Sequence, residues 1–274
     1  MVSRHTILLL FLVMGLASAD FSASFKSFII NNYSQQMYDD LARNDLGAVG
    51  SYGGGTHDGY SPTSRRAVIL VHGTTNNAGN FFGQRNALLS NGWSQEIVYG
   101  TTYGSGSAIT PATDVSMECE FVQQMRNFIK VVADFTKQKV DILGHSLVSP
   151  IVRKGDSWWE MCPSSVETYI SVAGANKASY LCVLPITNAC SSVNGLFCLF
   201  SFLKNINSVQ RYEGSHIYSI YGTQDDKVGY LNLPCFTKNS QINNSDQEFS
   251  NATGNHDAIL SGTIDLQMNL LNAH

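Results

Sequence analysis

The fold of this chain is decided by the stretch Lys139-Val-Asp-Ile-Leu-Gly-His-Ser-Leu-Val148. Its residues 140–143 are short, apolar and β-branched, which indicates a buried strand. Residues 144–146 read Gly-His-Ser, and residues 147–154 are able to continue as a helix. A strand, a tight turn with a serine and a helix form the layout of a nucleophile elbow, whose serine faces a cleft at the carboxyl end of a sheet. The motif alone leaves another interpretation open, namely a serine that caps a helix after a strand.

The elbow pattern is Gly-x-Ser-x-Gly, and this chain departs from it at Val148. The second glycine normally lets the helix pass close to a strand, and overpacking there costs about 1–3 kcal/mol unless the neighbours are smaller. A shift of about 1 Å at the reacting atoms lowers turnover by about a hundredfold. We therefore expect weak turnover that rises in the Val148→Gly variant with little change in substrate affinity. Equal or lower turnover in that variant would contradict this expectation.

The length of the chain and its first residues indicate how many domains the protein has and whether it is exported. A chain of 274 residues is long enough for one α/β domain with a sizeable core. Residues 1–19 are expected to be a secretory signal peptide, with Arg4, an apolar core at 7–16 and a small-residue cleavage site at 17–19. The apolar run is too short to span a bilayer. We therefore expect a soluble, secreted, extracellular protein with one domain at 20–274.

The cysteines, glycosylation signals and charge agree with export. Six cysteines lie beyond the signal: Cys119, Cys162, Cys182, Cys190, Cys198 and Cys235. An even number in an exported chain predicts three disulfides, and their spacing fits no zinc pattern, so neither a metal nor a cofactor is expected. Asn32, Asn243 and Asn251 begin glycosylation acceptor tripeptides. The formal net charge is −4 without a basic cluster, which argues against a nucleic-acid partner.

Strands and helices alternate from residue 67 onward, which predicts a mostly parallel sheet with helices on both faces. The expected strands are 67–71, 95–99, 140–143, 168–173 and 216–221. The expected helices are 21–43 with a break near residues 31–32, 80–90, 118–137 and 147–154. Residues 255–271 are expected to form a short loop followed by a closing helix. The glycines at 53–55 are interpreted as a flexible connector, because no strand precedes them and no Gly-Lys-Ser/Thr follows. We find no internal repeat and no second domain.

A serine nucleophile needs a base, and three histidines follow Ser146 in the chain. His274 is the last residue and is expected to fray. His216 begins a strand, and few acidic residues lie between Ser146 and His216 that could serve as the acid of a triad. His256 lies in a loop before a helix and is the preferred base, with an ordinary surface histidine as the alternative.

The acid and the oxyanion donors are expected on two further loops. Asp225 follows the strand at 216–221 and is the first choice of acid, with Asp226 second. The alternative is an aspartate-rich turn in which one carboxylate is solvated or paired to Lys227. The backbone N–H groups of Leu147 and Thr74 are expected to bind the oxyanion, although His72 and Gly73 also fit an ordinary turn at the end of a strand.

These segments resemble the class 2 lipases, which are small secreted bacterial triacylglycerol lipases and their secreted nematode relatives. The resemblance rests on residues 68–74, 141–153, 219–228 and 255–260, covers nearly all of the mature chain and is closest to the nematode branch. It implies an α/β-hydrolase fold and hydrolysis of carboxyl esters of lipids. The implied triad is Ser146, Asp225 and His256, with Thr74 and Leu147 at the oxyanion positions.

Residues 175–214 are expected to form a small cap insertion. The segment is rich in apolar residues and holds three of the cysteines, so disulfides would tie it beside the site, where an apolar face would receive an acyl chain. We pair Cys119 with Cys162, because Cys119 opens the helix before the elbow, Cys162 lies just beyond the helix after it, and these two helices are expected to be neighbours in space. The other four cysteines would tie the cap to itself and to the loop after Asp225.

Two functions remain open. The first is a secreted lipase or esterase that forms an acyl-enzyme on a lipid or small ester, with transient contact with a lipid interface and no stable protein partner. The second is a catalytically silent protein with a lipase fold that binds lipid or a surface partner. The intact triad favours the enzyme, and Val148 favours the binder. The Ser-x-x-Lys spacing of Ser201 and Lys204, typical of another class of acylases, is attributed to chance because no Lys-Thr-Gly follows.

Overall fold

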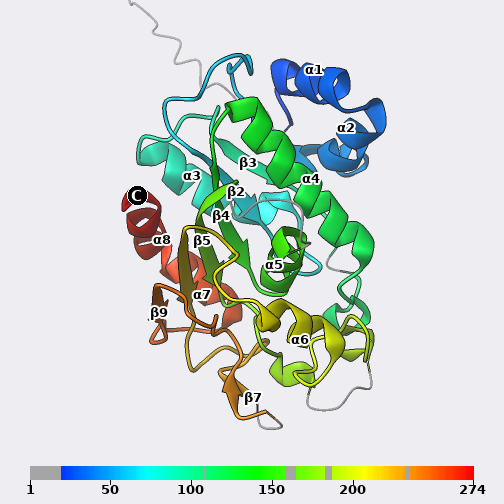
Figure 1. Cartoon of the computed structure of the whole chain (residues 1–274), viewed down its shortest axis with the longest axis vertical. Coiled ribbons are helices and arrows are strands. Elements are labelled where there is room, and N and C mark those ends of the chain that lie inside the picture. Colours follow the sequence, from blue (N-terminus) through cyan, green and yellow to red (C-terminus); the bar gives the residue numbers. More distant parts are fainter. Residues whose placement is uncertain (1–19, 108, 158–164, 183–186, 233–234) are drawn as a thin grey trace, which may run out of the picture.

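A computed structural model describes residues 20–107, 109–157, 165–182, 187–232 and 235–274, without the side chains of residues 112, 148 and 155–157. A seven-stranded sheet runs through the middle of the described molecule, with helices on both of its faces (Figure 1). The signal peptide expected at 1–19 lies outside the described residues. Among the described helices, none combines the length and the apolar character that crossing a bilayer requires.

The sheet has the strand order β1-β3-β2-β4-β5-β6-β9. Its strands are β1 (Ser51–Tyr52), β2 (Ala67–Val71), β3 (Val98–Thr101), β4 (Val140–His145), β5 (Val166–Val172), β6 (His216–Ile220) and β9 (Gln247–Phe249). β1 is antiparallel to β3, and all other neighbouring strands are parallel, which confirms the mostly parallel sheet. Parallel strands end at the same edge, so the segments after β2, β4 and β6 meet there.

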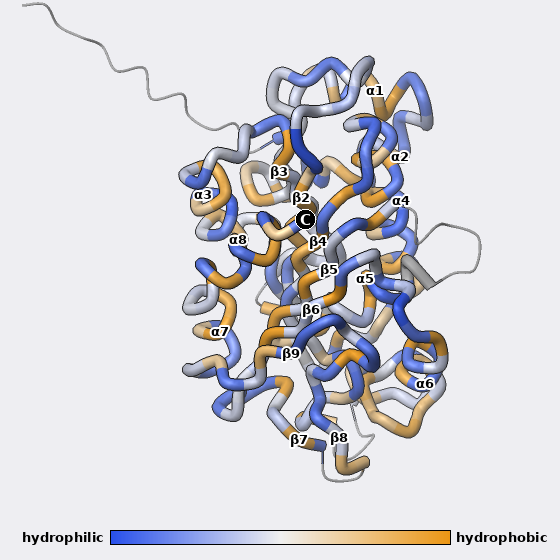
Figure 2. Tube along the Cα trace, turned by 60° about the vertical axis from the view of Figure 1, so that its left-hand side comes forward, coloured by the Kyte–Doolittle hydropathy of each residue, from blue (hydrophilic) through white to orange (hydrophobic). Residues whose placement is uncertain are grey.

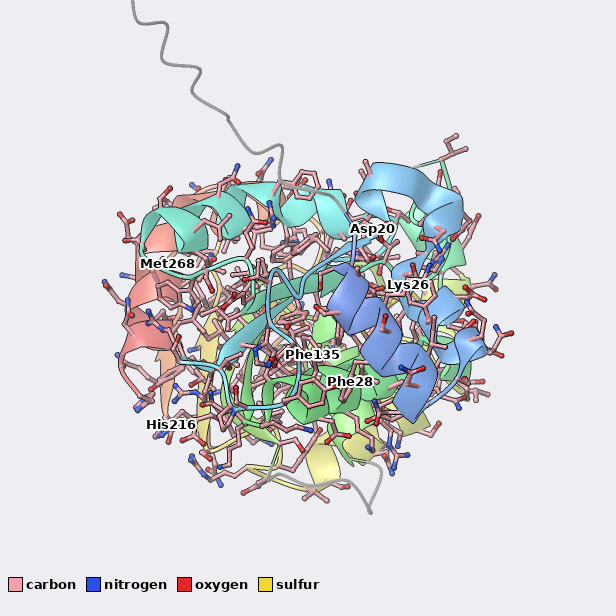
Figure 3. All side chains as sticks on the ribbon, turned by 90° about the horizontal axis from the view of Figure 1, so that it is seen from above. Asp20, Lys26, Phe28, Phe135, His216 and Met268 are labelled. Atoms are coloured by element: carbon pink, nitrogen blue, oxygen red, sulfur yellow. A yellow bond between two sulfur atoms is a disulfide. The ribbon has the colours of Figure 1, made fainter. Side chains whose placement is uncertain are left out.

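The helices form one layer on each face of the sheet (Figures 1 and 2). On one face lie α3 (Phe82–Ser90), α7 (His256–Gly262) and α8 (Ile264–Asn272). On the other lie α1 (Ala23–Asn32), α4 (Cys119–Thr136) and α5 (Val148–Ser157). The rings of Phe28 on α1 and Phe135 on α4 pack with their centroids 5.1 Å apart (Figure 3). α2 (Gln35–Ala42), α6 (Ser201–Ser208) and the small hairpin of β7 (Leu231–Asn232) and β8 (Thr237–Lys238) lie outside these layers.

The core lies between the sheet and the two helix layers. Every residue of β2 and β4 is buried, because these central strands are covered on both faces. The central strands are accordingly coloured as hydrophobic in Figure 2. α4 turns one apolar face toward the core, with Val122, Met125, Phe128, Ile129 and Val132 buried. This packing gives the elbow a rigid base.

Several local predictions differ from the structure. The helix expected at 21–43 is broken as predicted, and Ser34 begins α2 by accepting a hydrogen bond from the Met37 N–H at 3.0 Å. The segment 255–271, expected as a short loop and one helix, forms two helices, α7 and α8, that are divided at Thr263, and α7 begins at His256 itself. The strand expected at 95–99 lies at 98–101. The prediction of a flexible connector at 53–55 is wrong. A Cβ on Gly53 would come within 2.3 Å of the Tyr99 ring, so this turn is tightly packed. β9 and α6 were not predicted.

Two disulfides hold the cap insertion. Cys182 pairs with Cys190 inside the cap, and Cys198 pairs with Cys235 in the segment that follows Asp225. These two disulfides agree with the expectation that the cysteines of residues 175–214 pair with one another and with the segment after Asp225. Cys162 lies outside the described residues, so its pairing with Cys119 stays a prediction.

A buried ion pair joins α5 to the cap. Nε of Arg153 lies 2.9 Å from Oε1 of Glu213, and both side chains are 1% exposed. Arg153 also donates to the carbonyl oxygens of Asn176 and Ile206, each at 3.2 Å. The pair and these hydrogen bonds fasten α5, the helix that follows Ser146, to the segment 175–214.

The Glu213→Ala variant is expected to lose about 3–5 kcal/mol of unfolding free energy, because it leaves a buried guanidinium without its counter-charge. Urea denaturation at pH 7.5 measures the loss. The matched control is Asp257→Ala, which removes the partner of Lys227 in a pair 2.8 Å apart with side chains 60% and 51% exposed. That exposed pair is expected to contribute about 0–1 kcal/mol. Equal losses in the two variants would contradict the assignment.

Candidate active site

Ser146 lies in the turn between β4 and α5 with φ at +65°. This left-handed conformation is uncommon for a residue with a side chain and is a form of local strain. The surroundings hold it: the Ser146 N–H donates to the Val172 carbonyl at 3.0 Å, and its own carbonyl accepts from the Ala175 N–H at 3.3 Å. The predicted strand-turn-helix is thus present at residues 140–157.

Gly73 lies directly against the serine. A Cβ built on Gly73 would come within 2.9 Å of the Ser146 Cβ, closer than real side chains approach. The loop after β2 reaches the elbow because residue 73 has no side chain. The sequence showed the His72-Gly73 pair, but not this reason for the glycine.

The structure brings the three predicted residues into one hydrogen-bonded chain. Nε2 of His256 lies 2.8 Å from Oγ of Ser146, and Nδ1 of His256 lies 2.9 Å from Oδ2 of Asp225. A carboxylate only accepts hydrogen bonds, so Nδ1 carries the proton and Nε2 is free to accept the hydroxyl proton. All three residues are buried. His256 begins α7 and Asp225 follows β6, so three separate elements supply the chain.

Asp225 and Asp226 have different partners. Oδ1 of Asp225 also accepts from the N–H groups of Lys227 at 2.9 Å and Val228 at 2.8 Å. Burial acts to raise the pKa of Asp225, but hydrogen bonds from His256 and the backbone outweigh it and hold the pKa below its usual range. Asp226, the second choice of acid, accepts instead from the backbone N–H of His256 at 3.0 Å. Asp225 thus contacts the ring, and Asp226 contacts the main chain.

Thr74 and Leu147, the two residues expected to bind the oxyanion, lie in the two loops that meet at the serine. Thr74 is in the loop after β2, Leu147 immediately precedes α5, and both are buried. Within the described parts of the chain, no group accepts a hydrogen bond from either N–H. Unpaired buried donors of this kind suit a developing negative charge, and the N-terminus of α5 adds to the effect.

His72 controls the orientation of the Thr74 N–H. Its Nδ1 donates to the Gly73 carbonyl at 2.7 Å, and its Nε2 accepts from the Tyr103 N–H at 3.1 Å. The Gly73 carbonyl and the Thr74 N–H belong to one planar peptide unit, so fixing the oxygen fixes the opposite direction of the N–H. The rings of His72 and Tyr103 also stack, with their centroids 4.4 Å apart. No local signal in the sequence indicated this role of His72.

The other two candidate bases lie away from Ser146. His216 begins β6 at the amino edge of the sheet, where its ring stacks on that of His274 with centroids 3.4 Å apart. The prediction that His274 frays is wrong, because its ring lies 2.7 Å from the Tyr218 hydroxyl and Arg66 donates to its carbonyl at 2.7 Å.

A family model described as Lipase (class 2) matches residues 65–269. The chain belongs to the class 2 lipase family. The resemblance inferred from the sequence is confirmed, and the matched range contains Ser146, Asp225 and His256.

Solved structures show the same fold for this class 2 lipase. Aspergillus fumigatus lipase B matches with a TM-score of 0.56 and 16% identity, over 80% of this chain and 54% of that chain. Bacillus licheniformis lipase BlEst2 in its mature form matches with a TM-score of 0.56 and 15% identity, over 81% of this chain and 96% of that chain. The chain thus spans about half the length of the Aspergillus protein. At these identities the likeness concerns the fold, and the predicted α/β-hydrolase fold is confirmed.

His145 is a second histidine beside the base of this class 2 lipase. It is buried, and its ring centroid lies 4.6 Å from that of His256. Burial, and then the nearby His256, lower the pKa of His145 to about 3, so its ring stays neutral. A neutral neighbour adds no positive charge beside the base. The same effect of burial lowers the pKa of His72 to about 4.

One group of potential metal ligands occurs among the described residues, and it adjoins the triad. Single ligand atoms of His145, His256 and Asp257 lie within 4.8 Å of one another. Both ring nitrogens of His256 are already bonded to Ser146 and Asp225, so a metal there would have to break that chain. The site therefore gives no support for a metal, and none is assigned to the chemistry.

Folding of this class 2 lipase is expected to weaken in mild acid. An unfolded histidine has a pKa near 6.5, so between about pH 6.5 and 4 the unfolded chain binds protons at residues 72 and 145 that the folded chain does not. Protonation then favours the unfolded state, and each histidine contributes a slope of about 1.4 kcal/mol per pH unit.

Urea denaturation at constant ionic strength from pH 7 to 4.5 tests this expectation. The His72→Asn variant is expected to lose one of the two contributions and show a shallower dependence on pH. An unchanged slope in this variant would show that His72 is protonated equally in both states.

Proposed function

We propose that this class 2 lipase hydrolyses carboxyl esters through a Ser-His-Asp triad. The observation that carries the proposal is the continuous hydrogen-bonded chain from Asp225 through His256 to Ser146. It lies at the carboxyl edge of a parallel sheet, where α/β folds place their sites. Fold, order along the chain and hydrogen-bond directions all support the same roles.

The proposed reaction proceeds through an acyl-enzyme. Oγ of Ser146 attacks the ester carbonyl while Nε2 of His256 takes the hydroxyl proton. The N–H groups of Thr74 and Leu147 bind the oxyanion of the tetrahedral intermediate, and His256 gives its proton to the leaving alcohol. Water then attacks the acyl-enzyme with His256 again as base, and the carboxylic acid is released. Asp225 stays ionised and stabilises the imidazolium in both halves.

The substrate proposed is a lipid or a small ester. Both solved structures described above carry the name lipase. Apolar side chains are exposed on the segment 175–214, including Tyr180 at 48%, Leu181 at 44% and Leu199 at 51%. The cap adjoins the acid loop, because the Tyr180 N–H donates to the Val228 carbonyl at 2.8 Å. This placement supports an acyl-binding face and transient contact with a lipid interface. No stable protein partner is proposed.

Secretion and glycosylation belong to the same proposal. Disulfides are typical of exported proteins, and the described residues contain two. Asn32 and Asn251 are exposed and Asn243 is half-exposed, so glycan acceptors at these positions are accessible. Tryptic mapping of the secreted protein after deglycosylation would identify the occupied asparagines.

Val148 motivates a second candidate, a silent protein with a lipase fold that binds lipid or a surface partner. The side chain of Val148 is outside the described set, so its effect stays a prediction. A fluorophosphonate probe separates the candidates, because it labels a serine only when the base and the oxyanion donors are in place. We expect labelling of Ser146 and turnover of p-nitrophenyl butyrate. A folded protein that neither labels nor turns over esters would support the silent binder.

A further inference from the structure

A cavity of about 510 Å³ lies far from the proposed triad. It is formed by the first described residues, the turn after β1, α3 and the loop before β3. Its walls include Asp20, Gly53, Thr56, Arg85, Ser94 and Glu96. These segments lie around the amino end of β3, beside α1, whereas the triad occupies the opposite edge, toward the cap (Figure 1). Asp20 is seen at the start of α1 in Figure 3.

Arg85 is a buried cation in this wall without a counter-charge. The residue is 7% exposed, and its Nε is enclosed with no acceptor. Within the described residues, no group accepts a hydrogen bond from its guanidinium or forms an ion pair with it. Its nearest aromatic contact is the Tyr52 ring, whose centroid lies 5.2 Å away. A guanidinium keeps its charge in proteins, so burial without an acceptor is costly.

The two carboxylates in the wall are engaged elsewhere. Oδ1 of Asp20 accepts from the Phe21 N–H at 2.8 Å. Oε1 of Glu96 accepts from the Thr56 hydroxyl across the cavity rim. Neither pairs with Arg85, although both place negative charge on the wall. The guanidinium of Arg85 therefore offers several N–H donors to a ligand in the cavity, while the carboxylates of Asp20 and Glu96 repel a ligand with more than one negative charge.

We propose that Arg85 binds the carboxylate of a small monocarboxylic acid in this cavity. A guanidinium fork matches two oxygens of one planar anion, which carboxylates and phosphates both present. Asp20 and Glu96 repel each added negative charge, so a monoanion is favoured over a phosphate dianion. Serine, threonine and glycine dominate the rest of the wall, which suits a short acid. The proposal does not depend on ester hydrolysis.

Thermal unfolding of the full chain with sodium butyrate, against sodium chloride at equal ionic strength, tests the proposal. Butyrate is expected to raise Tm, by about 5–10 °C at 100 times its Kd, with a rise that follows the logarithm of its concentration above Kd. Butyramide, which has the same shape without the charge, is expected to have no effect. Arg85→Met is expected to abolish the rise. Arg65→Met, which removes an arginine that stacks on Trp93 outside the cavity, is expected to retain it.

The outcomes separate the possible partners of Arg85. An equal rise in Arg85→Met would place the acid elsewhere, including at Ser146, and overturn the proposal. If butyrate raises the Tm of the Glu96→Gln variant but not that of the wild type, the proposal is overturned, because Glu96 is then the partner of Arg85 within the protein. If Arg85→Met does not fold, equilibrium dialysis of labelled butyrate with the wild type decides. The proposal is supported if acetate competes with labelled butyrate, butyramide does not, and the Glu96→Gln variant binds butyrate several-fold more tightly than the wild type. Any other pattern overturns it.

Discussion

Replacement of Ser146 by alanine is expected to lower kcat for p-nitrophenyl butyrate by a factor of about 10⁴–10⁶. The variant keeps the oxyanion donors and the substrate contacts but has no atom to form the acyl-enzyme. His256→Ala is expected to cost a similar factor, because the hydroxyl then has no base 2.8 Å away. Nucleophile and base act as one unit, so the double variant is expected to be little slower than either single variant.

Ser201→Ala is the matched control for this result. Ser201 begins α6 on the cap, where its hydroxyl donates to the Val193 carbonyl at 2.9 Å. It carries the Ser-x-x-Lys spacing that we attribute to chance, so its replacement is expected to leave kcat unchanged. Circular dichroism should show that all variants stay folded. Near wild-type turnover in His256→Ala would remove that residue from the role of base, and loss of turnover in Ser201→Ala would move the nucleophile.

The second large effect distinguishes two adjacent aspartates. Asp225→Asn is expected to lower kcat by about 10⁴, as in other triads, because the amide favours the wrong imidazole tautomer and carries no charge to stabilise the imidazolium. KM is expected to change little. In Asp226→Asn the side-chain oxygen still accepts from the His256 backbone N–H, so a loss of less than about tenfold is expected.

Asp226→Ala completes this series. It removes the acceptor that holds the His256 main chain, so its loss of kcat is expected to lie between the losses of the two asparagine variants. Steady-state kinetics with one ester measure all three. A larger loss in Asp226→Asn than in Asp225→Asn would move the acid by one residue and contradict the geometry described here.

The sequence determined the elements that carry the site, because each has a local signal. The mostly apolar run at 140–143, with β-branched Val140 and Ile142 and followed by Gly144, specifies a strand and a tight turn, and the period of apolar residues specifies α4. The order of Ser146, Asp225 and His256 along the chain selected the same residues that the structure brings together. Cysteine positions likewise indicated a tied cap.

Only the tertiary structure decided which atoms meet. Asp225 and Asp226 are chemically identical neighbours, and the turn after β6 alone directs one to the ring and the other to the main chain of His256. Gly73 and His72 act on residues that pack against them from another strand or loop, so no local pattern reveals their roles. Arg85 reads as an ordinary polar residue of a helix until packing encloses it. Local preferences act over a few residues, whereas these contacts join residues that are distant in sequence, and only the folded chain brings them within reach.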